Sequence, residues 1–336
     1  MRALPVLVSL AFVPLAALAL LHGGPWLLAL PVYGLVVVPA VDHVFGLCAQ
    51  AAPASRVQRG FAFVWVPIQF ALVLGLAASA DTLGGSALFV AAIGIGLATG
   101  GVGGASAFAL IVRGGRFNRA AAELLTWPIL YGSFAVRHGG ENGARAATPK
   151  DPATPRFGEG FYGYFLRSTF IGLFAAWDAE EERLHAEGRS TLSLSNAFLR
   201  AFIAYAVLIE AALLLGGALG VMALFVQAFV AWVVIDAGAY VARYGLLRRP
   251  LGQGHFEPLG PQHAWSATGD APRLPGSFCA MALIATLWPE RFVRLMNPRV
   301  IAWHARYWET ATPPATSEEH AEATLSEARA QALYSP

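Results

Sequence analysis

Long apolar runs alternate with short polar breaks along most of this chain, and the runs come in pairs. A helix needs roughly 20 apolar residues to cross the hydrocarbon core of a bilayer. Short turns separate the members of each pair at His22–Pro25, Asp81–Gly85 and Gly216–Gly217. The sequence therefore predicts an all-α integral membrane protein with six transmembrane helices in three hairpins and a helical cytoplasmic cap. The predicted spans are Leu4–Leu21, Trp26–Leu47, Phe61–Ser79, Ala87–Val112, Phe198–Leu215 and Val221–Tyr240.

The composition supports this interpretation. The chain is 56% hydrophobic and 13% charged, whereas about 25% of a soluble domain is charged. Arg2 precedes the first apolar run as it would in a signal peptide, but the length of the run and its immediate apolar neighbour favour a span. Basic and acidic residues nearly balance, 23 against 21, and there is no basic patch with interleaved aromatic residues. These features exclude nucleic acid as a partner.

Arginines mark one side of the predicted bundle. Arg56 and Arg59 follow the second span, Arg113 and Arg116 follow the fourth, and the hairpin turns contain neither Lys nor Arg. By the positive-inside rule, both termini face the cytoplasm. We therefore divide the chain into transmembrane helices 1–4 (1–112), a cytoplasmic loop with helices (113–197), transmembrane helices 5–6 (198–245), a cytoplasmic or interfacial cap (246–312) and a polar tail (313–336).

Two cytoplasmic segments, Asn118–Val136 and Phe161–Leu184, mix apolar with charged residues, which is typical of interfacial or cap-domain helices. We interpret the acidic cluster at Asp178–Glu182 as a solvated helix face rather than a metal site. The glycine-rich run Thr99–Gly104 does not fit the spacing of a dinucleotide fingerprint. Because it lies inside a span, it favours close packing of helices. Cys48 and Cys279 are far apart, and we interpret both as small buried residues.

Five segments together resemble one family of membrane enzymes. They are Ala147–Arg156, Tyr240–Arg249, Glu257–Ser266, Ala271–Pro275 and Met296–Val300. In order and spacing they are similar to segments of the membrane-bound alkane monooxygenases, relatives of the fatty acid desaturases, and the resemblance extends from about Trp26 to Val300. It implies a multi-pass protein of the bacterial inner membrane. It also implies a histidine cluster that holds two irons for the oxidation of alkanes by dioxygen.

The histidine motifs of that family are degraded in this chain. The first, His-Glu-Leu-x-His, corresponds to Phe108–Val112, so Phe108 and Val112 stand at two ligand positions. The second, Glu-His-x-x-Gly-His-His, corresponds to Arg137–Gly143. There His138 is retained, while Asn142 and Gly143 replace two ligands.

The remaining motifs are also lost. Arg243 replaces the histidine of Asn-Tyr-x-Glu-His-Tyr-Gly-Leu, and a guanidinium has no lone pair for a metal. The fourth motif belongs between Trp265 and Ala271, where its whole segment is missing. Eight of the nine histidine positions that the resemblance implies are therefore lost, and we expect no di-iron cofactor.

We also looked for compensating metal ligands among the other histidines and acids. No two of the eight histidines lie three or four positions apart, as a helical metal site requires. His138, His255 and His263 could meet Glu141, Asp236 and Glu257 at the cytoplasmic mouth, but we favour ordinary polar lining over an atypical metal site. In particular, we predict a polar pocket formed by His138, Asp236, Arg243 and His263, with Asp236 and Arg243 as a buried pair. Glu210 is a further intramembrane acid, and such residues are costly and usually functional.

These observations favour a protein that is not an enzyme. We predict a catalytically inactive alkane monooxygenase-like protein that binds membrane lipid or a hydrocarbon, with an active paralogue or another membrane complex as partner. The first alternative is an alkane- or fatty-acid-oxidising monooxygenase with an atypical metal site. The second is a lipid or ion transport protein that uses Glu210 and Asp236.

Overall fold

The protein is helical throughout most of its length. The computed structural model describes residues 4–47, 56–139, 145–252, 255–266 and 272–309. The chain divides into two compact units. The first comprises residues 1–47, 52–143 and 173–236, and the second comprises 48–51, 144–172 and 237–336.

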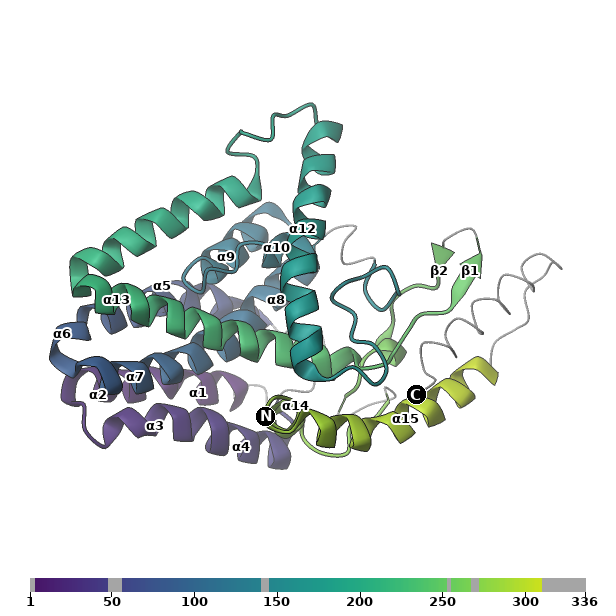
Figure 1. Cartoon of the computed structure of the whole chain (residues 1–336), viewed down its shortest axis with the longest axis horizontal. Coiled ribbons are helices and arrows are strands. Elements are labelled where there is room, and N and C mark those ends of the chain that lie inside the picture. Colours follow the sequence, from purple (N-terminus) through teal and green to yellow (C-terminus); the bar gives the residue numbers. More distant parts are fainter. Residues whose placement is uncertain (1–3, 48–55, 140–144, 253–254, 267–271, 310–336) are drawn as a thin grey trace. The chain divides into compact units, whose positions relative to one another are not determined.

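The first unit is an α-helical bundle in which α2, α3, α5 and α7 pack against one another (Figure 1). Its helices are α1 (Leu4–Leu10), α2 (Phe12–His22), α3 (Trp26–Val32), α4 (Val38–Phe45), α5 (Arg56–Ala78), α6 (Ala80–Leu83), α7 (Gly85–Ala98), α8 (Ala105–Arg113), α9 (Arg116–Thr126), α10 (Phe134–His138) and most of α13 (Ala197–Arg243). Two π-helical turns, η1 (Tyr33–Val37) and η2 (Thr99–Gly104), join α3 to α4 and α7 to α8.

Five helical segments among the described residues are long and apolar enough to cross a membrane. They are Leu4–His22, Trp26–Phe45, Val57–Ala78, Gly85–Arg113 and Ala197–Arg243. The first four match the first four predicted spans to within a few residues. The fifth, 47 residues long, contains both remaining predicted spans.

The long helix α13 bends where the sequence predicts a turn. Gly216 and Gly217 leave the helical conformation there, and the two arms of α13 fold back on each other in Figure 1. Gly217 has φ of +57°, which side chains with a Cβ rarely adopt. A Cβ on Gly216 would collide with the backbone carbonyl of Ala77. Both glycines are therefore needed, one for its conformation and one for close approach to α5.

Glycines in and beside η2 bring the fourth span close to the second arm of α13. A Cβ on Gly100 would lie 2.7 Å from Cα of Ala231, and a Cβ on Gly104 would lie 2.5 Å from Cγ1 of Ile235. Because the atoms nearest to a Cβ on Gly100 belong to the backbone of Ala231, no side-chain rotation can relieve that collision. The prediction that this run permits close packing is confirmed.

The segment after the fourth span differs from the single helix predicted over Asn118–Val136. The helix stops after α9, and an irregular stretch, Trp127–Ser133, leads into α10. Pro128 cannot donate a backbone hydrogen bond, and Leu130 has a positive φ of 53°. The stretch is largely buried rather than spread on a surface.

Side chains from the spans satisfy backbone carbonyls in the last turn of α9 and in this buried stretch. Nε2 of Gln69 donates to the carbonyl of Leu125, and Nε2 of Gln227 donates to that of Pro128 at 2.7 Å. Nε1 of Trp232 donates to the next carbonyl, Ile129, at 2.6 Å. Irregular backbone is tolerated at membrane depth only where its polar groups find partners inside the protein. The two intramembrane glutamines therefore have a structural role.

Helix α12 (Phe161–Ala186) crosses from the second unit to the first. Apolar side chains are exposed along it at nearly every fourth position, namely Tyr162, Leu166, Phe170, Phe174 and Trp177. This spacing places them on one face of the helix, as the prediction of an interfacial helix requires.

The second unit has an aromatic core. Tyr240, Tyr244 and Phe292 pack ring against ring, with centroids 5.0 to 5.3 Å apart. Nε1 of Trp265 donates to the carbonyl of Tyr244 at 2.7 Å. The other elements of the unit are the antiparallel pair β1 (Pro250–Gly252) and β2 (His255–Phe256), the turn η3 (Pro261–His263), α14 (Phe278–Leu287) and α15 (Pro289–Glu309).

Candidate functional site

The residues at the first histidine motif lie beside the one retained histidine. Phe108 of α8 and His138, the last residue of α10, have ring centroids 5.7 Å apart in an edge-on contact. The ring centroid of Phe134 lies 4.2 Å from that of the imidazole. Val112 lies one turn after Phe108 and is exposed. Phe108, the α8 residue whose ring contacts His138, thus presents hydrocarbon to it.

The tautomer of His138 follows from its hydrogen bond. Its Nδ1 lies 3.0 Å from the carbonyl oxygen of Phe134, one turn earlier in α10. Because a carbonyl can only accept, Nδ1 carries the proton, and Nε2 carries the lone pair in the neutral ring. Asn142, Gly143 and Glu141 lie outside the described residues.

Asp236 is buried in the second arm of α13, where a tyrosine contacts its carboxylate. The hydroxyl of Tyr131 lies 3.1 Å from Oδ1 and 3.3 Å from Oδ2 of the carboxylate. Nη1 of Arg137 in turn donates to the Tyr131 hydroxyl oxygen. A carboxylate, a phenol and a guanidinium thus form a chain inside the first unit. Sequence reasoning did not predict this role for Tyr131.

The predicted polar pocket draws on both units. His138 and Asp236 belong to the first unit, and Arg243 and His263 belong to the second. Arg243 is the last residue of α13 and is half-buried. The grouping of the four side chains and the pairing of Asp236 with Arg243 stay predictions.

His263 is buried in a polar cluster of the second unit. Its Nδ1 accepts a hydrogen bond from the backbone N–H of Gly260 at 3.0 Å, so the proton lies on Nε2. That atom is 3.0 Å from Oε1 of Glu257 and 3.1 Å from the Tyr307 hydroxyl. The Tyr307 hydroxyl donates to the same carboxylate oxygen. Arg249 completes the cluster from its Nε, 3.2 Å from Oε2 of Glu257.

The electrostatics of this cluster suit a structural role. Burial, more than any other influence, lowers the pKa of His263 below 6.5, so the ring is neutral at pH 7. For Glu257, burial alone would raise the pKa, but hydrogen bonds from the Arg249 N–H, Tyr307 and His263 outweigh it and lower the pKa. Both His263 nitrogens and the Glu257 carboxylate are thus engaged with protein groups. His255, at the start of β2, is exposed.

The described residues contain no group of three or more His, Cys, Asp or Glu side chains that could hold a metal ion. His263 and Glu257 form a pair without a third such ligand. Cys279 is half-buried in α14, and Cys48 lies outside the described part of the chain. Glu210 lies on an exposed face of the first arm of α13.

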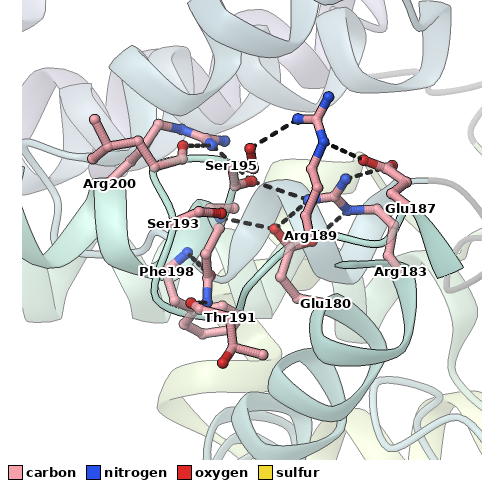
Figure 2. Close-up of polar contacts among 12 residues, drawn as sticks. Glu180, Arg183, Glu187, Arg189, Thr191, Ser193, Ser195, Phe198 and Arg200 are labelled. Atoms are coloured by element: carbon pink, nitrogen blue, oxygen red, sulfur yellow. Dashed lines mark hydrogen bonds and ion pairs between the residues drawn. The ribbon is translucent and has the colours of Figure 1, made fainter. Parts of the chain in front are cut away.

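Sequence analysis missed a network of arginines and glutamates in the first unit, shown in part in Figure 2. Glu180 is only 2% exposed, so interpreting the whole acidic cluster as a solvated face was wrong at this residue. Its carboxylate accepts from Nε of Arg183 at 2.9 Å and Nη2 at 2.8 Å, and from the backbone N–H of Ala197 at 2.8 Å. Burial would raise the pKa of Glu180, but Arg183 and the Ala197 N–H more than offset it and lower the pKa.

The network continues from Glu180 to the start of α13. Arg119 lies 3.6 Å from Glu123 and 3.9 Å from Glu180, and Arg200 binds Glu123. The spacing of Glu180 and Arg183 along one helix predicts their pairing. No sequence signal predicts the pairing of Glu123 with Arg200, because the partners are 77 residues apart.

An apolar groove of about 440 Å³ lies beside this network. Phe70 contributes from α5, Trp127 from the end of α9, and Ala204 and Val207 from the first arm of α13. Arg200 is the one charged residue among those that line it.

Apolar helices of bilayer length, with buried polar groups satisfied inside the protein, define a multi-pass helical membrane protein.

Alkane 1-monooxygenase 1 of Alcanivorax borkumensis is 28% identical over 312 residues, which cover 81% of this chain and 76% of the relative. The alkane 1-monooxygenase of Ectopseudomonas oleovorans is 26% identical, and the match covers 81% of this chain and 79% of the relative. Alkane 1-monooxygenase 2 of Pseudomonas aeruginosa is 24% identical, and the match covers 84% of this chain and 86% of the relative. Over about four-fifths of its length the chain is therefore similar to alkane 1-monooxygenases. No family model matches the chain.

Proposed function

We propose that this protein is a non-catalytic member of the alkane monooxygenase family that binds a hydrophobic ligand and acts as a partner or regulatory subunit in the membrane. The observation that carries the proposal is the contact between Phe108 and His138. At the ligand positions that the resemblance implies, a phenyl ring takes the place of an imidazole beside the retained histidine.

The donor chemistry at these positions does not fit a di-iron pair. Iron needs several nitrogen or oxygen donors at fixed spacing, and the side chains of Phe108 and Val112 have none. Arg243 carries a permanent positive charge, which repels a metal cation. His263, a second-unit histidine, is already held by Glu257, Tyr307 and Gly260. We therefore expect no bound iron.

The proposal includes a topology. In it, each arm of α13 counts as one span, which gives six spans in three hairpins, and the arginines after the second and fourth spans support cytoplasmic termini. The membrane is then the bacterial inner membrane. The ligand is a membrane lipid or hydrocarbon, and the partner is an active paralogue or another membrane complex in lipid metabolism.

Iron content tests the proposal directly. The full-length protein, expressed with added iron and purified in detergent, is analysed for metal by mass spectrometry, beside a relative that retains all four histidine motifs. We expect substantially less than one iron per chain here, and no conversion of octane or hexadecane to alcohol with an electron donor present. Two irons per chain, as in an intact di-iron site, would overturn the proposal.

Two alternatives make different predictions. The chain's similarity to alkane 1-monooxygenases over about four-fifths of its length favours an oxidising enzyme with an atypical metal site. In that case His138→Ala abolishes activity and removes bound metal. The buried Asp236 and the intramembrane Glu210 favour a lipid or ion transport protein. In that case Asp236→Ala and Glu210→Ala abolish flux across proteoliposomes without loss of fold.

A further inference from the structure

The groove of the first unit is apolar along its length and ends at a charged network. Its walls come from Phe70, Trp127, Ala204 and Val207, and Arg200 lies among them. A volume of about 440 Å³ falls within the ~300–1,000 Å³ of typical ligand pockets. The groove therefore has room for a hydrocarbon chain.

Arg200 adds little polarity to the groove, because each nitrogen of its guanidinium already donates to a protein acceptor. Nε donates to Glu123 at 3.0 Å, and Nη2 donates to both oxygens of the same carboxylate at 2.7 and 2.9 Å. Nη1 donates to the carbonyls of Leu194 and Ser195 at 2.8 and 3.0 Å. These bonds engage all three nitrogens of the guanidinium. The apolar lining and the engaged Arg200 together favour a hydrocarbon occupant.

The surroundings of the groove are those of a lipid-facing surface. Ile203, Val207 and their neighbour Phe202 on the first arm of α13 are exposed. In the loop before α13, Leu192 is 84% exposed and Leu194 66% exposed. In a chain of this hydropathy, such side chains face bilayer lipid rather than water.

Arginines on the rim supply positive charge. Nη1 of Arg189 donates to Oγ of Ser195 at 2.8 Å, next to Leu194 of the groove (Figure 2). The Arg189 side chain pairs with Glu187 at 3.4 Å and remains 56% exposed, and that of Arg119, which pairs with Glu123 and Glu180, is 42% exposed. Exposed arginines at a membrane surface attract anionic lipid headgroups.

We infer that the groove binds one acyl chain of an anionic phospholipid, with its phosphate at Arg189 and Arg119. The apolar walls fit the acyl chain, as does Arg200, whose nitrogens already have protein acceptors. The exposed arginines fit the headgroup. The inference does not depend on the proposed loss of iron, because none of these residues belongs to the histidine motifs. The phospholipid lies in the leaflet on the side of the arginines.

The experiment uses native mass spectrometry of the full-length protein, delipidated in mild detergent and titrated with palmitoyl-oleoyl phosphatidylglycerol. We expect the wild type to retain one phosphatidylglycerol. Ala204→Phe places a ring in the groove and should weaken retention at least about tenfold. The matched control is Ala206→Phe, two residues along the same arm, exposed and outside the groove lining. It should retain lipid as the wild type does.

A second variant tests the headgroup site. Arg189→Gln should weaken retention of phosphatidylglycerol several-fold. Phosphatidylcholine carries the same phosphate but also a cationic choline, so the wild type should retain it less tightly than phosphatidylglycerol. Unchanged retention of phosphatidylglycerol by Arg189→Gln would overturn the assignment of the phosphate to the arginines.

If Ala204→Phe fails to fold, a crosslinking measurement on the wild-type protein tests the same inference. Phosphatidylglycerol with a diazirine in its acyl chain should label residues 200–208 more strongly than residues 213–215, which are exposed on the same helix. Equal labelling of the two segments would overturn the inference. So would a wild type that retains no lipid, or an Ala204→Phe variant that retains as much lipid as the wild type. Recovery of a free fatty acid or alkane, instead of phospholipid, from the purified protein would overturn the choice of ligand.

Discussion

Arg200 donates hydrogen bonds from two nitrogens to the carboxylate of Glu123, with Nη2 2.7 Å from Oε1 and Nε 3.0 Å from Oε2. The pair joins the middle of α9 to the first turns of α13, 77 residues further along the chain. Its paired geometry and the burial of Glu123 distinguish it from ordinary surface ion pairs. The same arginine holds two carbonyls of the loop before α13. One side chain therefore fixes α9, the loop and α13 together.

Glu123→Ala should destabilise the first unit. The change leaves the guanidinium of Arg200 partly buried without its counter-ion. Removing one partner of a fully buried pair costs about 3–5 kcal/mol. Because the Arg200 side chain is 29% exposed, we expect roughly 2–3 kcal/mol, measured as a lower midpoint of thermal unfolding in detergent.

The exposed pair of Arg294 and Glu290, 3.4 Å apart and 81% and 87% exposed, provides the control. Arg294→Gln should change stability by less than about 0.5 kcal/mol. Equal effects of the two substitutions would show that the buried network does not hold the helices together.

Two adjacent glycines of η2 should respond differently to the same substitution. Gly100→Ala drives a methyl group against the backbone of Ala231, which lies 2.7 Å from the new Cβ position at its Cα. Gly101→Ala meets only Cγ1 of Val234, at 4.0 Å. We expect Gly100→Ala to cost about 1–3 kcal/mol and Gly101→Ala to be close to neutral. Thermal unfolding of both variants measures the difference, and comparable losses would contradict the close packing of the fourth span on α13.

Asp236 and Tyr131 should prove energetically coupled. Asp236→Ala leaves the Tyr131 hydroxyl without its acceptor, at a cost of about 1–3 kcal/mol. Glu210→Ala, on an exposed face of the same helix, should cost much less. A double-mutant cycle of Tyr131→Phe and Asp236→Ala should give a coupling energy of about 0.5–3 kcal/mol. Strictly additive effects would contradict the hydrogen bond as the reason for a buried acid in this span.

The lengths of the apolar runs predicted the helices, because a run of apolar residues long enough to cross a bilayer forms few structures other than a helix. Turn chemistry placed the bend at Gly216 and Gly217 correctly. The polar contacts were harder to predict. Gln69 and Gln227 were visible as amides within spans. Their partners were not, because Gln69 binds a carbonyl in the last turn of α9 and Gln227 binds one in an irregular stretch that the sequence presented as helix. Pairs such as Glu123 and Arg200 depend on tertiary packing, which spacing along the chain does not encode.

Acid should destabilise the second unit through His263. Its pKa is lower in the folded protein than its ordinary value of 6.5, so the unfolded chain binds more protons as the pH falls below about 6.5. Stability is therefore greatest above that pH and decreases as the pH falls through the folded pKa. Glu257, with a pKa below its ordinary 4.5, adds a second loss in the same direction at lower pH. Together the two groups give a free energy of unfolding that rises with pH from acid to neutral.

His263→Gln tests the origin of this dependence. Glutamine keeps one donor and one acceptor for Glu257 and Gly260 but does not titrate, so the rise in stability as the pH increases toward about 6.5 should flatten. His185→Gln, at an exposed position of α12, should leave the curve of the wild type unchanged. Unfolding midpoints followed by tryptophan fluorescence from pH 4 to 8 provide the measurement. Wild type and His263→Gln with the same slope would show that the buried imidazole is not the group that responds to acid.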